Sequence, residues 1–158
     1  MSILNSLSLA IDLATRKRDQ SVVVLQHLQK THEASQDQMA QLEGYAAETE
    51  AKWATAAQAG STPELMGHHY QFMARLHPAS HIQKEVVSGS AQKVEVSRRL
   101  TMDCELRLAS LRLALKKKQA DLALLQGRRE QKQMDEFAAL PRWRTLHPAS
   151  LGEHHEHG

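Results

Sequence analysis

The chain has 158 residues, a net charge of +2 and one cysteine. Aromatic residues make up 4% of it, and it contains only 7 Gly and 4 Pro, which is typical of a long helix or coiled coil and not of a compact mixed domain. One cysteine excludes an intramolecular disulfide framework, and the small net charge argues against a general nucleic-acid binder. We therefore expect an all-α protein in a reducing, cytoplasmic setting.

The first helix is predicted from a hydrophobic repeat that begins at Leu4. Counting alternately in threes and fours leads from Leu4 to Ala56 without a register break. A sustained 3.5-residue repeat places one stripe of a helix against a partner helix in a left-handed coiled coil. We predict that this helix covers about residues 3–59. The N-terminus lacks the basic, apolar and small-residue order of a secretory signal.

A turn is predicted at residues 60–63. Gly60 suits the left-handed residue just past a helix end, and Thr62 followed by Pro63 suits an N-cap before the first helical position. Because this is the one strong break before the C-terminal tail, the two helices should fold back as an antiparallel coiled-coil hairpin.

The second helix is predicted to cover about residues 63–138. The same count from Met66 continues to Leu125 without a break, and Pro78 should kink the helix. The second helix is longer than the first, so its last turns should extend past the start of helix one. The middle of the seam is polar or small, which predicts weak, adaptable packing there and firmer packing near the termini.

The tail is predicted from the loss of this pattern after Leu140. Pro141 and His147-Pro148 should prevent the helix from continuing, and residues 152–158 are rich in His and Glu. We predict a coiled-coil domain over residues 1–140 and a disordered, His-rich tail over residues 141–158.

No group of residues predicts a catalytic site, a metal site or a cofactor. Cys104 lies on the seam, where a thiol packs as a small apolar group. His77 and His81 are one turn apart, but Pro78 distorts that turn and no third ligand is near. The tail histidines lack a supporting second shell. We expect a non-enzymatic protein that works by binding other proteins.

Charge is unevenly distributed along the chain. Residues 1–20 and 104–144, the open end of the predicted hairpin, carry thirteen basic and seven acidic side chains. Two interpretations explain this excess of basic side chains. The open end is either an ordinary solvated helical surface or a basic surface that meets an acidic partner. Near the turn, Tyr45, Trp53, Tyr70 and Phe72 should come close together, either to widen the packing or to form a docking patch.

Four segments resemble the flagellar export protein FliJ family, in the family's order. They are LAIDLATRKRDQ at residues 9–20, QMAQLEGY at 38–45, YQFMARL at 70–76 and REQKQMDEF at 129–137. The resemblance implies a cytoplasmic component of the flagellar type III export apparatus, peripherally associated with the inner membrane at the flagellar base. Its open end would enter the ring of the hexameric export ATPase as a central stalk, and it would also bind the membrane export gate protein and export chaperones.

The resemblance also implies two sets of contact residues. The export-gate set maps onto Gln38, Leu42, Tyr45, Phe72, Leu76 and Ala79, and Thr49 stands where the family often has a second aromatic. The residues predicted to contact the ATPase ring are Leu13, Arg16, Arg128, Arg129, Lys132, Asp135 and Glu136.

Three other functions fit a coiled coil of this kind. The first is the equivalent stalk of a virulence-type type III secretion injectisome. The second is a generic coiled-coil scaffold, whose termini would tolerate substitution. The third is a nucleic-acid-binding rod, whose affinity would fall steeply with salt.

Overall fold

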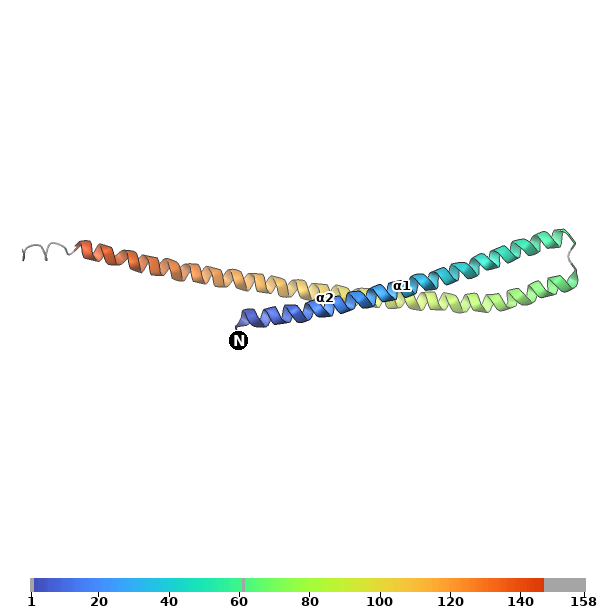
Figure 1. The fold of residues 1–158 in the computed structure, drawn as a ribbon, viewed down its shortest axis with the longest axis horizontal. Coiled ribbons are helices and arrows are strands. Elements are labelled where there is room, and N and C mark those ends of the chain that lie inside the picture. The colour runs from blue at the N-terminus through green and yellow to red at the C-terminus, as the bar shows by residue number, and fades with distance from the viewer. Residues whose placement is uncertain (1, 61, 147–158) are drawn as a thin grey trace, which may run out of the picture. The chain divides into compact units, whose positions relative to one another are not determined.

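The chain forms two helices, as the sequence predicts. The computed structural model describes residues 2–60 and 62–146. Helix α1 covers Ile3–Gln58 and helix α2 covers Pro63–Leu146 (Figure 1). The chain divides into two compact units, of which one comprises residues 1–11 and 110–158 and the other residues 12–109.

Both helices begin at capping side chains. The Asn5 N–H donates to Ser2 Oγ over 3.3 Å, and the Leu65 N–H donates to Thr62 Oγ1 over 3.4 Å. Such caps satisfy N–H groups that have no partner within the helix. After α1 ends, Gly60 has a φ of 85°, a left-handed conformation that glycine adopts without strain. The turn signals read from the sequence therefore act as predicted.

In the unit of residues 12–109, α1 and α2 pack as an antiparallel pair. Polar contacts across the pair join Ser21 to Thr101, and His32 to Ser90, so positions advance along α1 as they recede along α2 (Figure 1). Heptad position a falls on Leu4 in α1 and on Met66 in α2, and on every seventh residue after each. Heptad position d falls on Leu7 in α1 and on His69 in α2, and on every seventh residue after each. Throughout this unit every a and d residue is buried or half-buried, which confirms the predicted seam.

The middle of the seam is polar, and its side chains are bonded to one another. The Ser21 and Thr101 hydroxyls lie 2.6 Å apart, and His32 Nδ1 lies 2.7 Å from Ser90 Oγ. The Ser35 hydroxyl lies 3.1 Å from Ser90 Oγ, while Ser35 and Thr101 are buried. Hydrogen bonds satisfy these groups, which would otherwise be costly to bury. The sequence predicts weak packing here but not this specific pairing.

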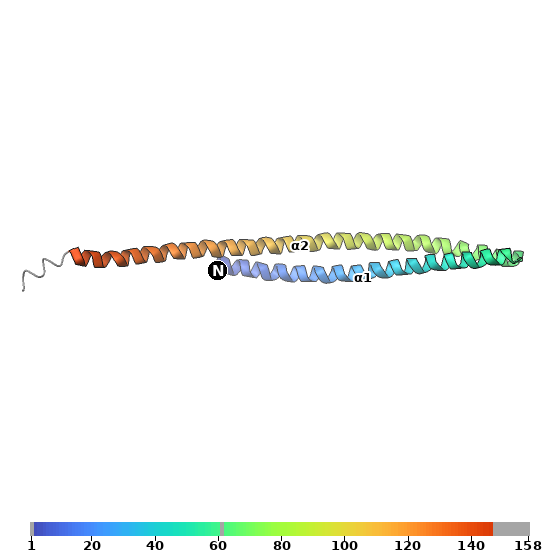
Figure 2. The same cartoon turned by 90° about the horizontal axis from the view of Figure 1, so that it is seen from above.

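In the unit of residues 1–11 and 110–158, α2 continues past the first residues of α1 (Figure 2). Leu4 and Leu7 on α1 are half-buried, as are Leu111 and Leu115 on α2. From residue 119 to residue 140 every residue of α2 is exposed. We call residues 119–140 the free segment of α2, because nothing among the described residues covers it.

The predicted end of helix two, near residue 138, was wrong, because α2 continues through Pro141 to Leu146. A proline removes one N–H donor and crowds the preceding turn, at a cost of about 3 kcal/mol, but the residues on either side keep their own backbone bonds. None of residues 142–146 is Gly or Pro. The backbone of α2 is also helical at Pro78, where a kink stays a prediction. The predicted disordered tail is helical in residues 141–146, and its residues 147–158 lie outside the described residues.

Leu108 provides a test of the seam. It is only 2% exposed, and replacing a buried Leu by Ala removes transfer energy and leaves a cavity. We expect Leu108→Ala to lower the free energy of unfolding by about 2–4 kcal/mol, measured by urea titration with circular dichroism. Leu106→Ala is the matched control, because Leu106 is exposed. Equal losses in the two variants would contradict the assigned seam.

Candidate functional site

The two-helix seam has two flanks, which the heptad positions define. We call the residues just before each a position the g flank, and the residues just after each d position the e flank. In the unit of residues 12–109, Tyr45 and Phe72 are both g residues, and their rings pack with centroids 5.6 Å apart at 62°. This edge-to-face contact shows that the g residues of the two helices meet on one side of the seam.

Five of the six residues predicted for one binding surface are accessible. We call Gln38, Leu42, Tyr45, Phe72, Leu76 and Ala79 the turn-proximal patch. Gln38, Tyr45 and Ala79 are exposed, whereas Leu42 and Phe72 are half-buried. Leu76 is only 8% exposed. Leu76 therefore holds the helices together beneath the patch and offers a partner little surface.

A groove lies at this patch, and three patch residues line it together with two further glutamines. It is lined by Gln38, Gln41, Leu42, Tyr45 and Gln83. Gln83 Nε2 donates to the Ser35 carbonyl oxygen over 2.8 Å and to Gln38 Oε1 over 3.3 Å. The side-chain amides are thereby oriented by the opposite helix. The groove combines an exposed aromatic ring with oriented polar groups, a combination common at protein interfaces.

The other two aromatic residues predicted near the turn take different places. Trp53 lies on the seam and packs on the His69 ring, with centroids 4.9 Å apart. His69 Nδ1 is buried without a hydrogen-bond partner in the described residues. Tyr70 is an e-flank residue and is exposed. Sequence reasoning grouped the four rings together, whereas the structure places Tyr45 and Phe72 alone at the g flank.

The e flank of the same stretch is charged. A second groove has a floor of Met39, Ala46, Met73 and Leu76, and a rim that includes Glu43, Glu50, His77 and Lys84. The polar groove and the charged groove thus lie on opposite sides of the seam.

The exposed side chains of the free segment of α2 include both charged and apolar residues. Arg128, Arg129, Lys132, Asp135 and Glu136, which were predicted to contact a partner, are all exposed there. Leu13 and Arg16, from the same prediction, are exposed in the other unit. The heptad count from Met66 places Leu122 and Leu125 on this segment, and a second apolar face lies outside that count.

That second face is formed by Met134 and Phe137. Both are exposed, and together with Glu130, Gln133 and Ala138 they line a groove. Gln133, Met134, Phe137 and Ala138 follow Glu130 by three, four, seven and eight residues. This spacing places the five residues on one side of a helix, offset from the seam positions. That spacing is the signal that could have revealed the face from the sequence.

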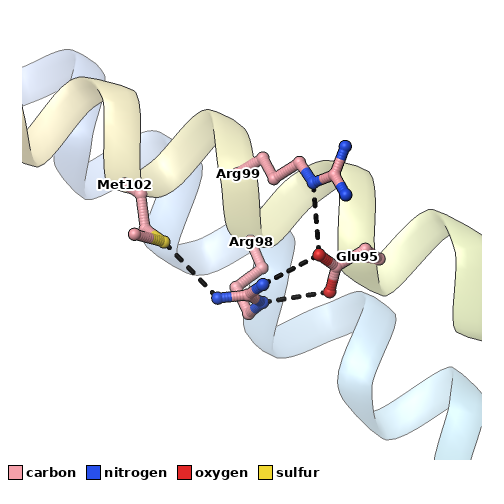
Figure 3. Close-up of polar contacts among 4 residues, drawn as sticks. All are labelled: Glu95, Arg98, Arg99 and Met102. Carbon is pink, nitrogen blue, oxygen red and sulfur yellow. Dashed lines mark hydrogen bonds and ion pairs between the residues drawn. The ribbon is translucent and has the colours of Figure 1, made fainter.

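In the unit of residues 12–109, α2 carries a cluster of ion pairs. Arg98 donates to both carboxylate oxygens of Glu95, at 3.0 and 2.8 Å, and Arg99 Nε donates to Glu95 Oε1 over 3.2 Å (Figure 3). The hydrogen bond from Arg98 holds the pKa of Glu95 below its usual range. The cluster is exposed and spans single helical turns, so it supports the helix only modestly.

Two other kinds of site are absent from the described residues. No group of three or more His, Cys, Asp and Glu residues there is arranged to hold a metal ion. Within residues 2–60 and 62–146, neither helix has a stretch long and apolar enough to cross a membrane.

Comparison with known proteins identifies one family. The family model described as "Flagellar FliJ protein" matches residues 4–146, which is nearly the whole chain. The match spans both helices, the turn and the free segment of α2. No curated protein and no solved structure matches the chain.

Proposed function

The chain belongs to the flagellar FliJ protein family, and from this we propose that it acts as the central stalk of the flagellar export ATPase. In this role the protein catalyses no reaction. It inserts one end into the hexameric ATPase ring, and it links the ring to the membrane export gate and to export chaperones. We place it in the cytoplasm, held at the inner membrane through the gate protein.

The free segment of α2 carries the ATPase part of this proposal. A lone helix is marginally stable in water, because most helical stability in proteins comes from packing an apolar face. This segment leaves Leu122, Leu125, Met134 and Phe137 uncovered by any described residue. A ring that encloses the segment would bury these side chains and stabilise the helix.

Charge supports the same assignment. Arg128, Arg129 and Lys132 on the free segment are exposed, and none of them forms an ion pair with a described residue. Unpaired basic groups speed encounter with an acidic surface, and salt screens that effect. We therefore expect an acidic lining in the ring that receives this end.

The turn-proximal patch is our proposed site for the export gate. Tyr45 is 56% exposed although it already packs against Phe72, so one side of the aromatic pair faces a partner without any rearrangement. A rigid, pre-packed ring loses little conformational entropy on binding. Leu76 supports the patch from below.

Copurification with the export ATPase tests the proposal. We expect the full chain, used as bait, to retain the purified ATPase at low salt and to lose it progressively as salt rises, because the contact includes basic side chains. A bait of the same chain denatured and immobilised controls for nonspecific retention. If the folded chain retains no ATPase at low salt, the stalk assignment fails and a generic scaffold is the better interpretation.

A further inference from the structure

The g flank continues away from the turn, beyond the turn-proximal patch. Val24 on α1, and Val86 and Leu100 on α2, are g residues of the unit of residues 12–109. They are 52%, 47% and 57% exposed. A left-handed coiled coil keeps all residues of one heptad position on the same flank, so these three side chains lie on the side where Tyr45 meets Phe72.

The charges on this flank have one sign. Every charged g residue among residues 12–60 and 62–109 is basic, namely Lys17, Lys52, Lys93 and Arg107. All four are exposed, and none forms a hydrogen bond or an ion pair with a described residue. Their charges are therefore available to a partner.

The e flank differs from the g flank in the sign of its charges and in their pairing. Its charged residues are of both signs and include Glu43, Glu50 and Glu105. One of its cations, Arg98, is already bonded to Glu95 (Figure 3). The two sides of the seam therefore present different chemistry. Only the g flank combines exposed apolar side chains with charged residues that are all basic and all unpaired.

We propose that the distal g flank, formed by Lys17, Val24, Val86, Lys93, Leu100 and Arg107, binds an acidic amphipathic helix of a partner protein as a third helix of the coiled coil. An apolar stripe on the partner covers Val24, Val86 and Leu100. Acidic residues bordering that stripe pair with Lys17, Lys93 and Arg107. Nucleic acid or an anionic lipid surface would satisfy the cations but would not match apolar side chains at heptad spacing.

This inference does not depend on the proposed stalk function. None of the six residues belongs to the turn-proximal patch, and all six lie in the unit of residues 12–109, apart from the free segment of α2. Failure of binding at the distal g flank would therefore leave the gate and ATPase assignments unchanged. Failure of those assignments would likewise leave the distal g flank unaffected.

Three fluorescent synthetic peptides test the inference by anisotropy with the full chain. The first has Leu at its a and d positions and Glu at its e and g positions, which repel one another and disfavour self-association. The second replaces each Glu by Lys, and the third scrambles the first. We expect the Glu peptide to bind at least about tenfold more tightly than either of the others. Equal binding of the Glu and Lys peptides, or of the Glu and scrambled peptides, would overturn the proposal.

Variants of the chain locate the binding. Val86→Ser with Leu100→Ser should weaken the Glu peptide by about tenfold or more. The matched control is Val23→Ser with Leu106→Ser, because Val23 and Leu106 are more exposed than Val86 and Leu100 but lie on the outer faces of the helices. It should leave binding unchanged. Equal weakening by the two pairs would place the peptide elsewhere and refute the inference.

A charge reversal keeps the test valid if the serine variants lose helicity. Lys93→Glu with Arg107→Glu replaces exposed side chains and should leave the seam intact. We expect this variant to reverse the preference, so that the Lys peptide binds more tightly than the Glu peptide. An unchanged preference for the Glu peptide would show that these cations do not face it and would also refute the inference.

Discussion

Truncation of the chain after Gln126 should abolish its stimulation of export ATPase assembly. The truncation removes three exposed basic side chains of the free segment of α2, Arg128, Arg129 and Lys132, together with its exposed Met134 and Phe137. It leaves the seam intact, because every residue from 119 to 140 is exposed and the half-buried seam positions end at Lys118. Helicity of the remaining coiled coil and binding to the gate should therefore persist.

The measurement is ATPase activity as a function of ATPase concentration, with and without each form of the stalk. Replacing Arg128, Arg129 and Lys132 by Glu should reduce stimulation at low salt, where electrostatic steering is strongest. The matched control replaces Lys30, Arg75 and Lys84 by Glu, which changes net charge equally at exposed sites of the other unit. The stalk assignment fails if the truncated and full-length chains stimulate equally.

The second large effect is expected at the turn-proximal patch. Tyr45→Ala combined with Phe72→Ala should weaken binding to the export gate by about thirtyfold or more, since an aromatic anchor commonly contributes 2 kcal/mol or more to an interface. The edge-to-face contact between the two rings is itself worth about 0.5–1.5 kcal/mol. The double variant should therefore lose a little stability and keep nearly all of its helicity.

Gate affinity can be measured by titration calorimetry with the purified cytoplasmic domain of the gate protein. Tyr70→Ala is the matched control, because Tyr70 is also exposed near the turn but belongs to the e flank. Normal gate affinity in the Tyr45 and Phe72 double variant would refute the patch. A large loss of helicity would instead assign the two rings to packing of the helices.

The local elements of the fold could be predicted from the sequence. The seam follows from the 3.5-residue period, because that period returns the same face of a helix to its partner at each turn. All predicted seam positions from Leu4 to Ala56 and from Met66 to Lys118 are buried or half-buried. The turn follows from Gly60 and Thr62, whose backbone and capping preferences act within a few residues.

The extent of α2 was harder to predict, because proline acts as a cost and not as an absolute stop. Pro141 loses one hydrogen bond, and whether the helix continues depends on the residues that follow it. The second apolar face, at Met134 and Phe137, does not follow from the seam repeat, because both residues are offset from the a and d positions.

The sequence by itself determined that the chain forms two helices, which face of each is apolar and where the chain turns, because these features depend on neighbouring residues. Only the tertiary structure decided how α1 is aligned with α2, because a heptad pattern repeats and fits a partner equally well after a shift of one heptad. That alignment pairs His32 with Ser90 and Tyr45 with Phe72, and it buries Leu76 beneath the patch. Which residues a partner can reach is therefore a property of the packed pair of helices and not of either helix alone.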